Sequence, residues 1–355
     1  MKNRIAIVLS VALSLTVVLS ACGGGSAATP APSGSEPAPA SSASASGEPI
    51  HIIWANYGNS SMAPAQADQE MASLVQEKTN GGITIDYVPD GVLGGEADTM
   101  QQIMDGTLQC VSVGTAAVNT FTEYTEVFQL PFLLTDYETE YKAMTSPEAQ
   151  AIYDKVGEEL GIKIVGVEEN GIRDFANNVR PITSLDDMKG LKLRIAPSNM
   201  LTEVMTDLGA SPVTVSYGEV YSALQNKVVD GEEINITSIY AMKHYEVLKY
   251  VSQIGMYPFP SLIIFNLDFW NSLSPEYQQI ILDSAAQASE NCFQKYLPEY
   301  EETATAACKD SGVAFNTIDD NAKQAFIDAA QPTWDEYAAK DPLMADFINM
   351  VKAMK

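Results

Sequence analysis

The sequence predicts an α/β protein with two lobes, and three observations support this prediction. Strand and helix patterns alternate through the first half of the folded region, which is typical of a mostly parallel sheet with helices on both faces. Roughly 300 residues follow a polar N-terminal region, a length sufficient for two lobes. The dipeptide Asn170-Gly171 is a turn sequence between two extended segments, so we place the start of the second lobe there.

The spacing of apolar residues locates the elements of the first lobe. In chain order we expect strand 50–57, helix 67–78, strand 83–89, helix 95–106, strand 109–115, helix 147–160 and strand 162–169.

In the second lobe, the alternation in 191–195 predicts a strand that carries Arg194 opposite its apolar residues. Ser198 is a good N-cap for the helix that follows. Ser216 and Glu219 fit a capping box before another helix, and a further strand is expected to begin at 228–229.

A long helical region is expected to begin at Pro275 and to reach toward Lys309, with a kink or break at Pro298. We assign residues 49–170 and about 259–298 to lobe I, and 171–258 and about 299–355 to lobe II.

The N-terminus reads as a lipoprotein export signal. Residues 1–21 combine basic residues, an apolar run and small residues, as a secretory signal peptide does. The ending "LSAC" resembles a bacterial lipobox, so we expect Cys22 to carry the lipid anchor, with palmitate among its acyl chains. Residues 22–48 contain no large apolar residue and should form a flexible linker to the membrane.

The net charge of −26 argues against nucleic acid and anionic lipid as partners. An anionic ligand would therefore need a local cationic pocket.

The cysteine and histidine content indicates neither metal binding nor a disulfide framework. Apart from Cys22, the chain has Cys110, Cys292 and Cys308, which we expect to be buried free thiols. No cysteine or histidine cluster has metal-ligand spacing, and we expect no cofactor.

The arginines are clustered. Beyond the signal peptide the chain has only Arg173, Arg180 and Arg194, while every other basic residue is lysine. A guanidinium presents a rigid fork of donors that matches a carboxylate, which an ammonium cannot do. Arg194 also lies near the carboxyl end of its strand, where open α/β sheets bind ligands.

The chain resembles the extracytoplasmic solute-binding proteins of TRAP (tripartite ATP-independent periplasmic) transporters, typified by dicarboxylate and sialic-acid binding proteins. The resemblance rests on "DGVLGGEADTMQQIMDGTL", "LPFLLTDYE", "NGIRDFANNVRPITSLDDMKGLKLRIAPS" and "GEVYSALQNKVVDG", in family order over residues 50 to about 340. It implies a periplasmic-binding-protein-like fold, in which a long helix spans both lobes and the lobes close on an organic acid.

The resemblance also implies site residues. Arg194 would grip the ligand carboxylate, Arg173 would assist, and Tyr217 would pack on the ligand. Where the family commonly has "VDGQENP", this chain has "VDGEEIN", so Ile234 takes the place of the ligand-contacting asparagine and Asn235 is a candidate substitute.

Further candidates have weaker support. Gly114 and Thr115 stand where the sialic-acid branch has an acidic residue, which disfavours sialic acid. Ser60 and Ser61 follow the first strand, and Tyr257 lies near the expected crossing between lobes. Arg180 resembles a structural arginine of the family.

We therefore predict a monomeric, membrane-anchored extracytoplasmic lipoprotein that binds a small organic acid and delivers it to TRAP permease subunits. A ligand sensor of the same fold is the alternative. A secreted hydrolase is a remote one, since the chain has no G-x-S-x-G motif and only two histidines, His51 and His244.

Overall fold

The computed structural model describes residues 48–354. The predicted signal peptide, Cys22 and all but the last residue of the predicted linker lie outside the described residues. Among the residues described, no helix combines the length and the apolar character needed to cross a membrane.

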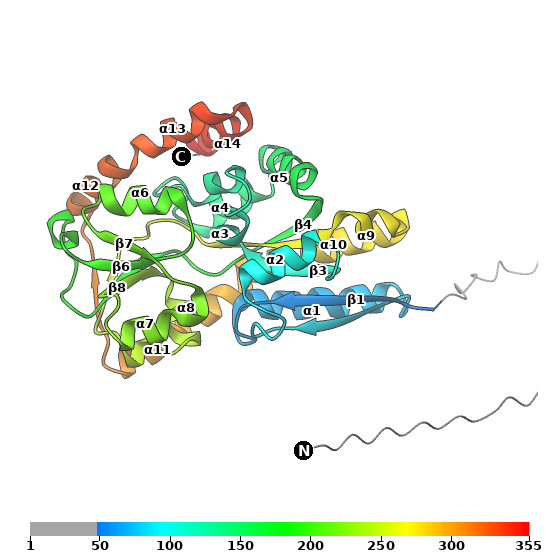
Figure 1. Cartoon of the computed structure of the whole chain (residues 1–355), viewed down its shortest axis with the longest axis horizontal. Coiled ribbons are helices and arrows are strands. Elements are labelled where there is room, and N and C mark those ends of the chain that lie inside the picture. Colours follow the sequence, from blue (N-terminus) through cyan, green and yellow to red (C-terminus); the bar gives the residue numbers. More distant parts are fainter. Residues whose placement is uncertain (1–47, 355) are drawn as a thin grey trace, which may run out of the picture. The chain divides into compact units, whose positions relative to one another are not determined.

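The first sheet has the strand order β2-β1-β3-β10-β4 (Figure 1). Its strands are β1 (Ile50–Asn56), β2 (Ile83–Val88), β3 (Cys110–Gly114), β4 (Ile162–Glu169) and β10 (Pro260–Asn266). β1 is parallel to β2 and β3, whereas β10 is antiparallel to both of its neighbours. All seven residues of β10 are buried, as expected for a central strand covered on both faces.

The second sheet has the order β11-β9-β5-β8-β6-β7. Its strands are β5 (Asp174–Asn177), β6 (Lys192–Ile195), β7 (Ser211–Thr214), β8 (Gly231–Ile234), β9 (Tyr250–Gln253) and β11 (Ala314–Thr317). β6 is parallel to β7 and β8, so the carboxyl ends of these three strands meet at one edge of the sheet.

Helices cover both sheets (Figure 1). The α-helices are α1 (Ala63–Lys78), α2 (Glu96–Met104), α3 (Thr115–Val118), α4 (Tyr137–Met144), α5 (Pro147–Leu160), α6 (Asn199–Asp207), α7 (Val220–Gln225), α8 (Ile236–Ala241), α9 (Leu267–Ser272), α10 (Pro275–Asn291), α11 (Leu297–Asp310), α12 (Asp320–Ala330), α13 (Pro332–Lys340) and α14 (Pro342–Met354). The shorter turns are η1 (Tyr124–Gln129), η2 (Leu185–Met188), η3 (Tyr217–Glu219), η4 (His244–Glu246) and η5 (Cys292–Tyr296).

Two chain segments cross between the sheets, one from β4 to β5 and one from β9 to β10. They are hydrogen-bonded to each other: the amide of Arg173 donates to Tyr257 O at 2.8 Å, and the amide of Met256 donates to Arg173 O at 2.9 Å. Gly171 lies in the first crossing with φ +122°, a conformation that side chains rarely adopt. The predicted turn at Asn170-Gly171 is therefore the start of a crossing.

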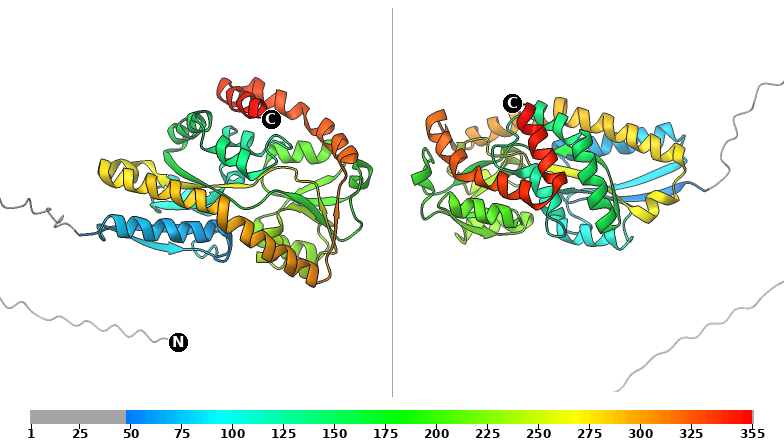
Figure 2. Two further views of the ribbon diagram at one scale, coloured as in Figure 1. Left: turned by 180° about the vertical axis from the view of Figure 1, so that it is seen from behind. Right: turned by 90° about the horizontal axis from the view of Figure 1, so that it is seen from above.

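The long helical region runs past both sheets without a break (Figure 2). α10 packs on β4 and α1, and α11 packs on α8 beside the second sheet. A π-helical turn, η5, joins them. The break predicted at Pro298 is absent: the proline is the second residue of α11 and directly follows the π-helical turn, whose wider hydrogen-bond spacing accommodates the missing N–H within a continuous helix.

Two local predictions about the second sheet were wrong, and one was confirmed. The Ser198 side chain accepts a hydrogen bond from the amide of Leu201, as an N-cap should. Ser216 makes no such bond, because a 3-10 turn follows it and α7 begins only at Val220. The strand expected at 228–229 begins instead at Gly231, since Val228 is exposed in the preceding turn.

The lobe boundaries stay a prediction. The C-terminal helices, however, pack against a different part of the chain from the one to which they were assigned. α14 packs against α4 and α5, which belong to the part assigned to lobe I, although residues 299–355 were assigned to lobe II. Trp334 of α13 also contacts the part assigned to lobe I, since its indole N–H donates to Pro131 O at 2.8 Å.

The cysteine prediction was confirmed within the described residues. Cys110, Cys292 and Cys308 are buried and free. Burial raises the pKa of each thiol.

Candidate functional site

Arg194 lies at the edge where β6, β7 and β8 end. Its side chain is only 2% exposed, and its Nε–H donates to Val215 O at 2.9 Å. Within residues 48–354 this carbonyl is the only hydrogen-bond acceptor for the Arg194 guanidinium. Burial, together with repulsion from Arg173, lowers the pKa of Arg194. Its remaining donors are thus available to an anion.

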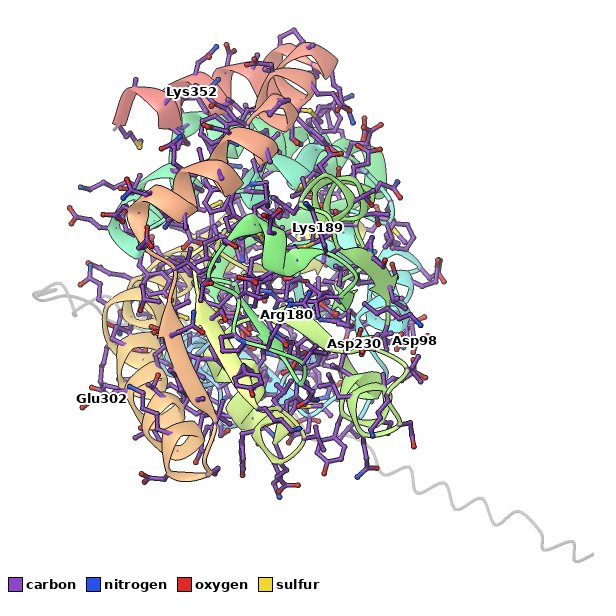
Figure 3. All side chains as sticks on the ribbon, turned by 90° about the vertical axis from the view of Figure 1, so that its left-hand side faces the viewer. Asp98, Arg180, Lys189, Asp230, Glu302 and Lys352 are labelled. Carbon is purple, nitrogen blue, oxygen red and sulfur yellow. The ribbon has the colours of Figure 1, made fainter. Side chains whose placement is uncertain are left out.

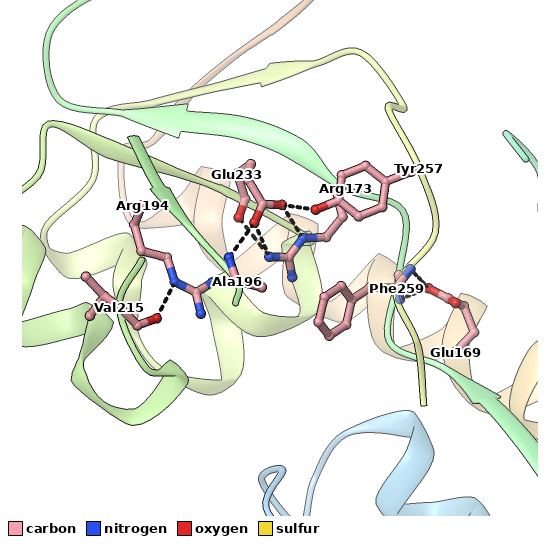
Figure 4. Close-up of polar contacts among 9 residues, drawn as sticks. Glu169, Arg173, Arg194, Ala196, Val215, Glu233, Tyr257 and Phe259 are labelled. Atoms are coloured by element: carbon pink, nitrogen blue, oxygen red, sulfur yellow. Dashed lines mark hydrogen bonds and ion pairs between the residues drawn. The ribbon is translucent and has the colours of Figure 1, made fainter. Parts of the chain in front are cut away.

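Arg173, in the crossing before β5, is instead already paired (Figure 4). Its Nε–H donates to Glu233 Oε2 at 2.7 Å, and its Nη2 group donates to Glu233 Oε1 at 3.0 Å and to the Glu233 carbonyl at 2.8 Å. Burial alone would raise the pKa of Glu233, but the Arg173 charge and these bonds hold it below its ordinary value. The pair is therefore ionised and neutral as a unit.

Other groups fix the Arg173–Glu233 pair in place. The Tyr257 hydroxyl donates to Glu233 Oε2 at 2.5 Å, and the amide of Ala196 donates to Oε1 at 3.0 Å. The guanidinium carbon of Arg173 lies 4.3 Å from the centre of the Phe259 ring, a cation–π contact. Figure 4 shows these contacts joining β6, β8 and the second crossing.

A cavity between the two sheets brings the arginines together with groups from the first sheet. Its lining residues are Tyr57, Gly58, Met62, Glu96, Asn170, Arg173, Arg194, Ala196, Tyr217, Ser238 and Phe259. The free space of about 10 Å³ holds about one water molecule. An organic acid can enter only if the walls move apart.

Glu96, the first residue of α2, places a carboxyl group opposite the arginines. The Gly114 backbone and the Tyr57 hydroxyl help to hold the pKa of this carboxyl down, while its buried Oε1 atom has no hydrogen-bond partner in the described chain. A Cβ atom at Gly114 would lie 2.8 Å from Oε1, so glycine is needed there for the carboxyl to approach. Burial raises the pKa of Glu96 to about 7, although the charge of Arg194 opposes the shift.

Aromatic and sulfur contacts across the cavity hold its two walls together. The Tyr217 hydroxyl is 3.8 Å from the sulfur of Met62, and the Tyr217 ring packs edge-on against Tyr57 with centroids 5.7 Å apart. Farther along the same interface, the hydroxyls of Ser61 and Tyr300 are 2.9 Å apart.

Beyond Tyr57, Glu96 and Tyr217 lies an outer cavity of about 640 Å³, which we call the vestibule. Four acidic residues and no lysine or arginine line it; the acids are Asp90, Glu96, Asp98 and Glu219. The vestibule is therefore negative and the inner cavity positive.

The structure brings three of the candidate residues to the inner cavity, namely Arg173, Arg194 and Tyr217. Tyr257 does not line the cavity but donates a hydrogen bond to Glu233, the partner of Arg173. The others lie away from the lining: Ser60 and Ser61 are exposed, and Thr115, Ile234 and Asn235 are buried outside it. Arg180 holds a loop instead, since its guanidinium donates to the carbonyls of Asp187 and Lys189. Figure 3 labels Arg180 and Lys189 on the ribbon.

Sequence reasoning missed Glu96 and Glu233. The rule that pointed to Arg194 also applies to them, because Glu233 lies near the carboxyl end of β8 and Glu96 opens the helix after β2. Gly114 was noted for lacking an acid, yet the Glu96 carboxyl contacts this position from a different element.

The fold consists of two β-sheets flanked by helices and joined by crossing segments, and buried cationic groups lie in a cavity between the sheets. This arrangement is that of a protein that binds a small anion by closing around it. The comparisons with known proteins are specific. Residues 56–341 match the family described as bacterial extracellular solute-binding protein, family 7, and the chain belongs to this family. It is accordingly an extracytoplasmic solute-binding protein of the TRAP type, and the family is one of binding proteins rather than enzymes.

Individual relatives are similar over most of their length. The 2,3-diketo-L-gulonate-binding periplasmic protein of Escherichia coli is 29% identical, over 80% of this chain and 86% of its own. The C4-dicarboxylate-binding protein DctP of Rhodobacter capsulatus is 28% identical, over 86% and 91%. A TRAP solute-binding protein from Sulfitobacter, with bound β-D-galacturonate, superposes with a TM-score of 0.79 at 27% identity, over 85% and 99%.

Proposed function

We propose that this protein captures a sugar acid with a single carboxylate. The observation that carries the proposal is the pairing of a buried arginine that has unused donors, Arg194, with a carboxyl group, Glu96, on the opposite wall. The ligand carboxylate would bind Arg194 through two charge-assisted hydrogen bonds. Arg173 would add positive potential and Tyr217 an aromatic wall.

The charge pattern favours a sugar acid over a C4-dicarboxylate. Arg173 is neutralised by Glu233, so Arg194 is the one cation on the lining of the inner cavity without a paired anion in the described chain. A second ligand carboxylate would face Glu96 and the acidic vestibule. Hydroxyl groups, by contrast, can donate to those carboxylates. Relatives that bind β-D-galacturonate and 2,3-diketo-L-gulonate support this choice.

A thermal-shift comparison tests the ligand class. A ligand at 100 times its Kd adds about 2.7 kcal/mol to stability, which raises the Tm by roughly 5 °C for a chain of this size. We expect such shifts from D-galacturonate or L-gulonate and none from the neutral sugar D-galactose. A larger shift with succinate than with either sugar acid would contradict the proposal.

We further propose that acylation of Cys22 anchors the protein at the membrane, where it presents its ligand to TRAP permease subunits. Acyl chains provide the stable attachment that a polar linker cannot. In a fractionation experiment, Cys22→Ser should move the protein from the membrane to the soluble fraction. Unchanged membrane attachment of the variant would refute the anchor. The sensor and hydrolase alternatives have no counterpart among the relatives named above.

A further inference from the structure

Glu96 and Arg194 face the same closed cavity from opposite sheets. Arg173, the other cation on the lining, makes two direct hydrogen bonds to the Glu233 carboxylate and so contributes no net charge as a pair. The charge balance of the cavity therefore depends on Arg194 and on whether Glu96 is ionised.

If Glu96 is ionised, the cavity is already neutral before a ligand arrives. A monocarboxylate bound there would then leave one uncompensated negative charge among buried side chains. Such a charge is costly in a dry interior, and a titratable group takes up a proton instead.

The groups around Glu96 favour its protonation once an anion occupies Arg194. From its own helix and the preceding loop, Asp98 and Asp90 add negative charge, and Glu219 does so from η3 on the opposite wall. Tyr57 and Tyr217 are neutral, since burial raises the pKa of both phenols. The two cations are Arg194, which the ligand would neutralise, and Arg173, which Glu233 neutralises.

We propose that the capture of a monocarboxylate is coupled to the uptake of one proton by Glu96. The inference rests on the proposed function and deepens it, because it assigns Glu96 as a residue that determines specificity for monoanions. The ligand carboxylate takes over Arg194, and the neutral Glu96 carboxyl can both donate a hydrogen bond to a ligand hydroxyl and accept one from it.

The sign of the pH dependence follows from a free Glu96 that titrates near pH 7. Below that pH Glu96 is protonated before binding, so Kd is constant until the ligand carboxylate itself protonates near pH 4. Above it, binding must add a proton, and Kd rises by up to tenfold per pH unit.

Calorimetric titration with D-galacturonate and L-gulonate at pH 6 and pH 8, in buffers of different ionisation enthalpy, measures the proton directly. We expect uptake approaching one proton at pH 8 and close to none below pH 6. Glu96→Gln should bind without proton uptake and with a Kd that does not change with pH.

Glu301→Gln is the matched control. The pKa of Glu301 is also raised to about 7 by burial, but this residue lies on α11 and accepts from Tyr137, away from the cavity. It should retain the wild-type proton uptake. Uptake that persists in Glu96→Gln and disappears in Glu301→Gln would overturn the assignment, as would sugar-acid binding by the wild type with no uptake at pH 8. Failure of both acids to bind at pH 6 would instead refute the proposed function, and the inference with it.

Discussion

Arg194 and Arg173 are buried at the same cavity, but their guanidinium groups have different partners. The Arg173 guanidinium donates two hydrogen bonds to the Glu233 carboxylate, whereas Arg194 donates only its Nε–H, to a backbone carbonyl. The energetic cost of burying Arg194 is thus left for a ligand to offset. This difference makes Arg194 the expected anchor of the ligand carboxylate.

Substitution of Arg194 should reduce affinity in two steps. Arg194→Lys keeps the charge but loses the two-bond geometry, so Kd for the best sugar acid should rise about ten- to a hundredfold in calorimetry. Arg194→Ala should bind more weakly still. Arg180→Lys is the control, because Arg180 only holds the loop that contains Asp187 and Lys189. Wild-type affinity in Arg194→Lys, together with a loss of affinity in Arg180→Lys, would show that the carboxylate anchor is not Arg194.

The Arg173–Glu233 pair should matter for folding. Glu233→Ala leaves a buried guanidinium without its anion, which costs about 3–5 kcal/mol. Urea unfolding should show this as a lower midpoint. Asp186→Ala, which breaks the exposed pair with Lys189, should leave the midpoint unchanged. Equal effects of the two substitutions would show that burial of the Arg173 pair is unimportant.

Among the elements, the first crossing segment has a clear backbone requirement at Gly171. Gly171 has φ +122°, and a Cβ atom there would lie 3.0 Å from Asn235 Cβ. Gly171→Ala should therefore lower the free energy of unfolding by about 1–3 kcal/mol. Gly218→Ala, at a glycine with ordinary φ and open space, should change it by less than about 0.5 kcal/mol. Tolerance of alanine at Gly171 would mean that the crossing relaxes easily.

Element prediction from the sequence succeeded where a pattern was long and local. The apolar spacing located α5 and β4 to the residue, and the cap at Ser198 was correct because one side chain and its own helix decide it. The capping box at Ser216 failed because a 3-10 turn replaced the first turn of the helix. The contacts of α14 with α4 and α5 depend on packing between distant segments, which no local pattern reports.

Prediction of the site likewise succeeded for features that a local sequence pattern reports and failed for those that depend on contacts between distant segments. Arginine rarity and strand alternation made Arg194 a candidate ligand residue, and the family resemblance gave its role and added Arg173 and Tyr217. Glu96 was missed because a carboxylate is unremarkable in a chain with 46 acidic residues. Its role depends on Gly114, which leaves space for it from another element.

At the scale of the whole molecule, buried carboxyl groups should make stability depend on pH. Burial raises the pKa of Asp68 and Asp174 to about 6, and that of Glu96 and Glu301 to about 7. Unfolded carboxyls titrate near pH 4, so the folded state binds more protons between pH 4 and pH 7. Stability is therefore greatest near pH 4 and falls as the pH rises toward 7.

Urea unfolding at pH 4.5, 6 and 8 should show the free energy of unfolding falling by on the order of 5 kcal/mol across this range. Glu301→Gln should flatten part of the slope, since it removes one titrating group. Below pH 4 the trend should reverse, because Glu233, whose pKa is lowered, gains a proton and loses its ion pair with Arg173. Stability that increases steadily from pH 4.5 to pH 8 would contradict the prediction.

The three buried thiols have a practical consequence for watching the lobes close. Cys110, Cys292 and Cys308 are inaccessible, and burial raises the pKa of each, so none should react with a maleimide at neutral pH. In a chain that begins after the linker, a single cysteine introduced at the exposed Glu219 would be labelled selectively with a fluorescent dye. The sequence after the linker thus needs no cysteine removed before such a dye, placed at the rim of the vestibule, can report capture and release of the solute in real time.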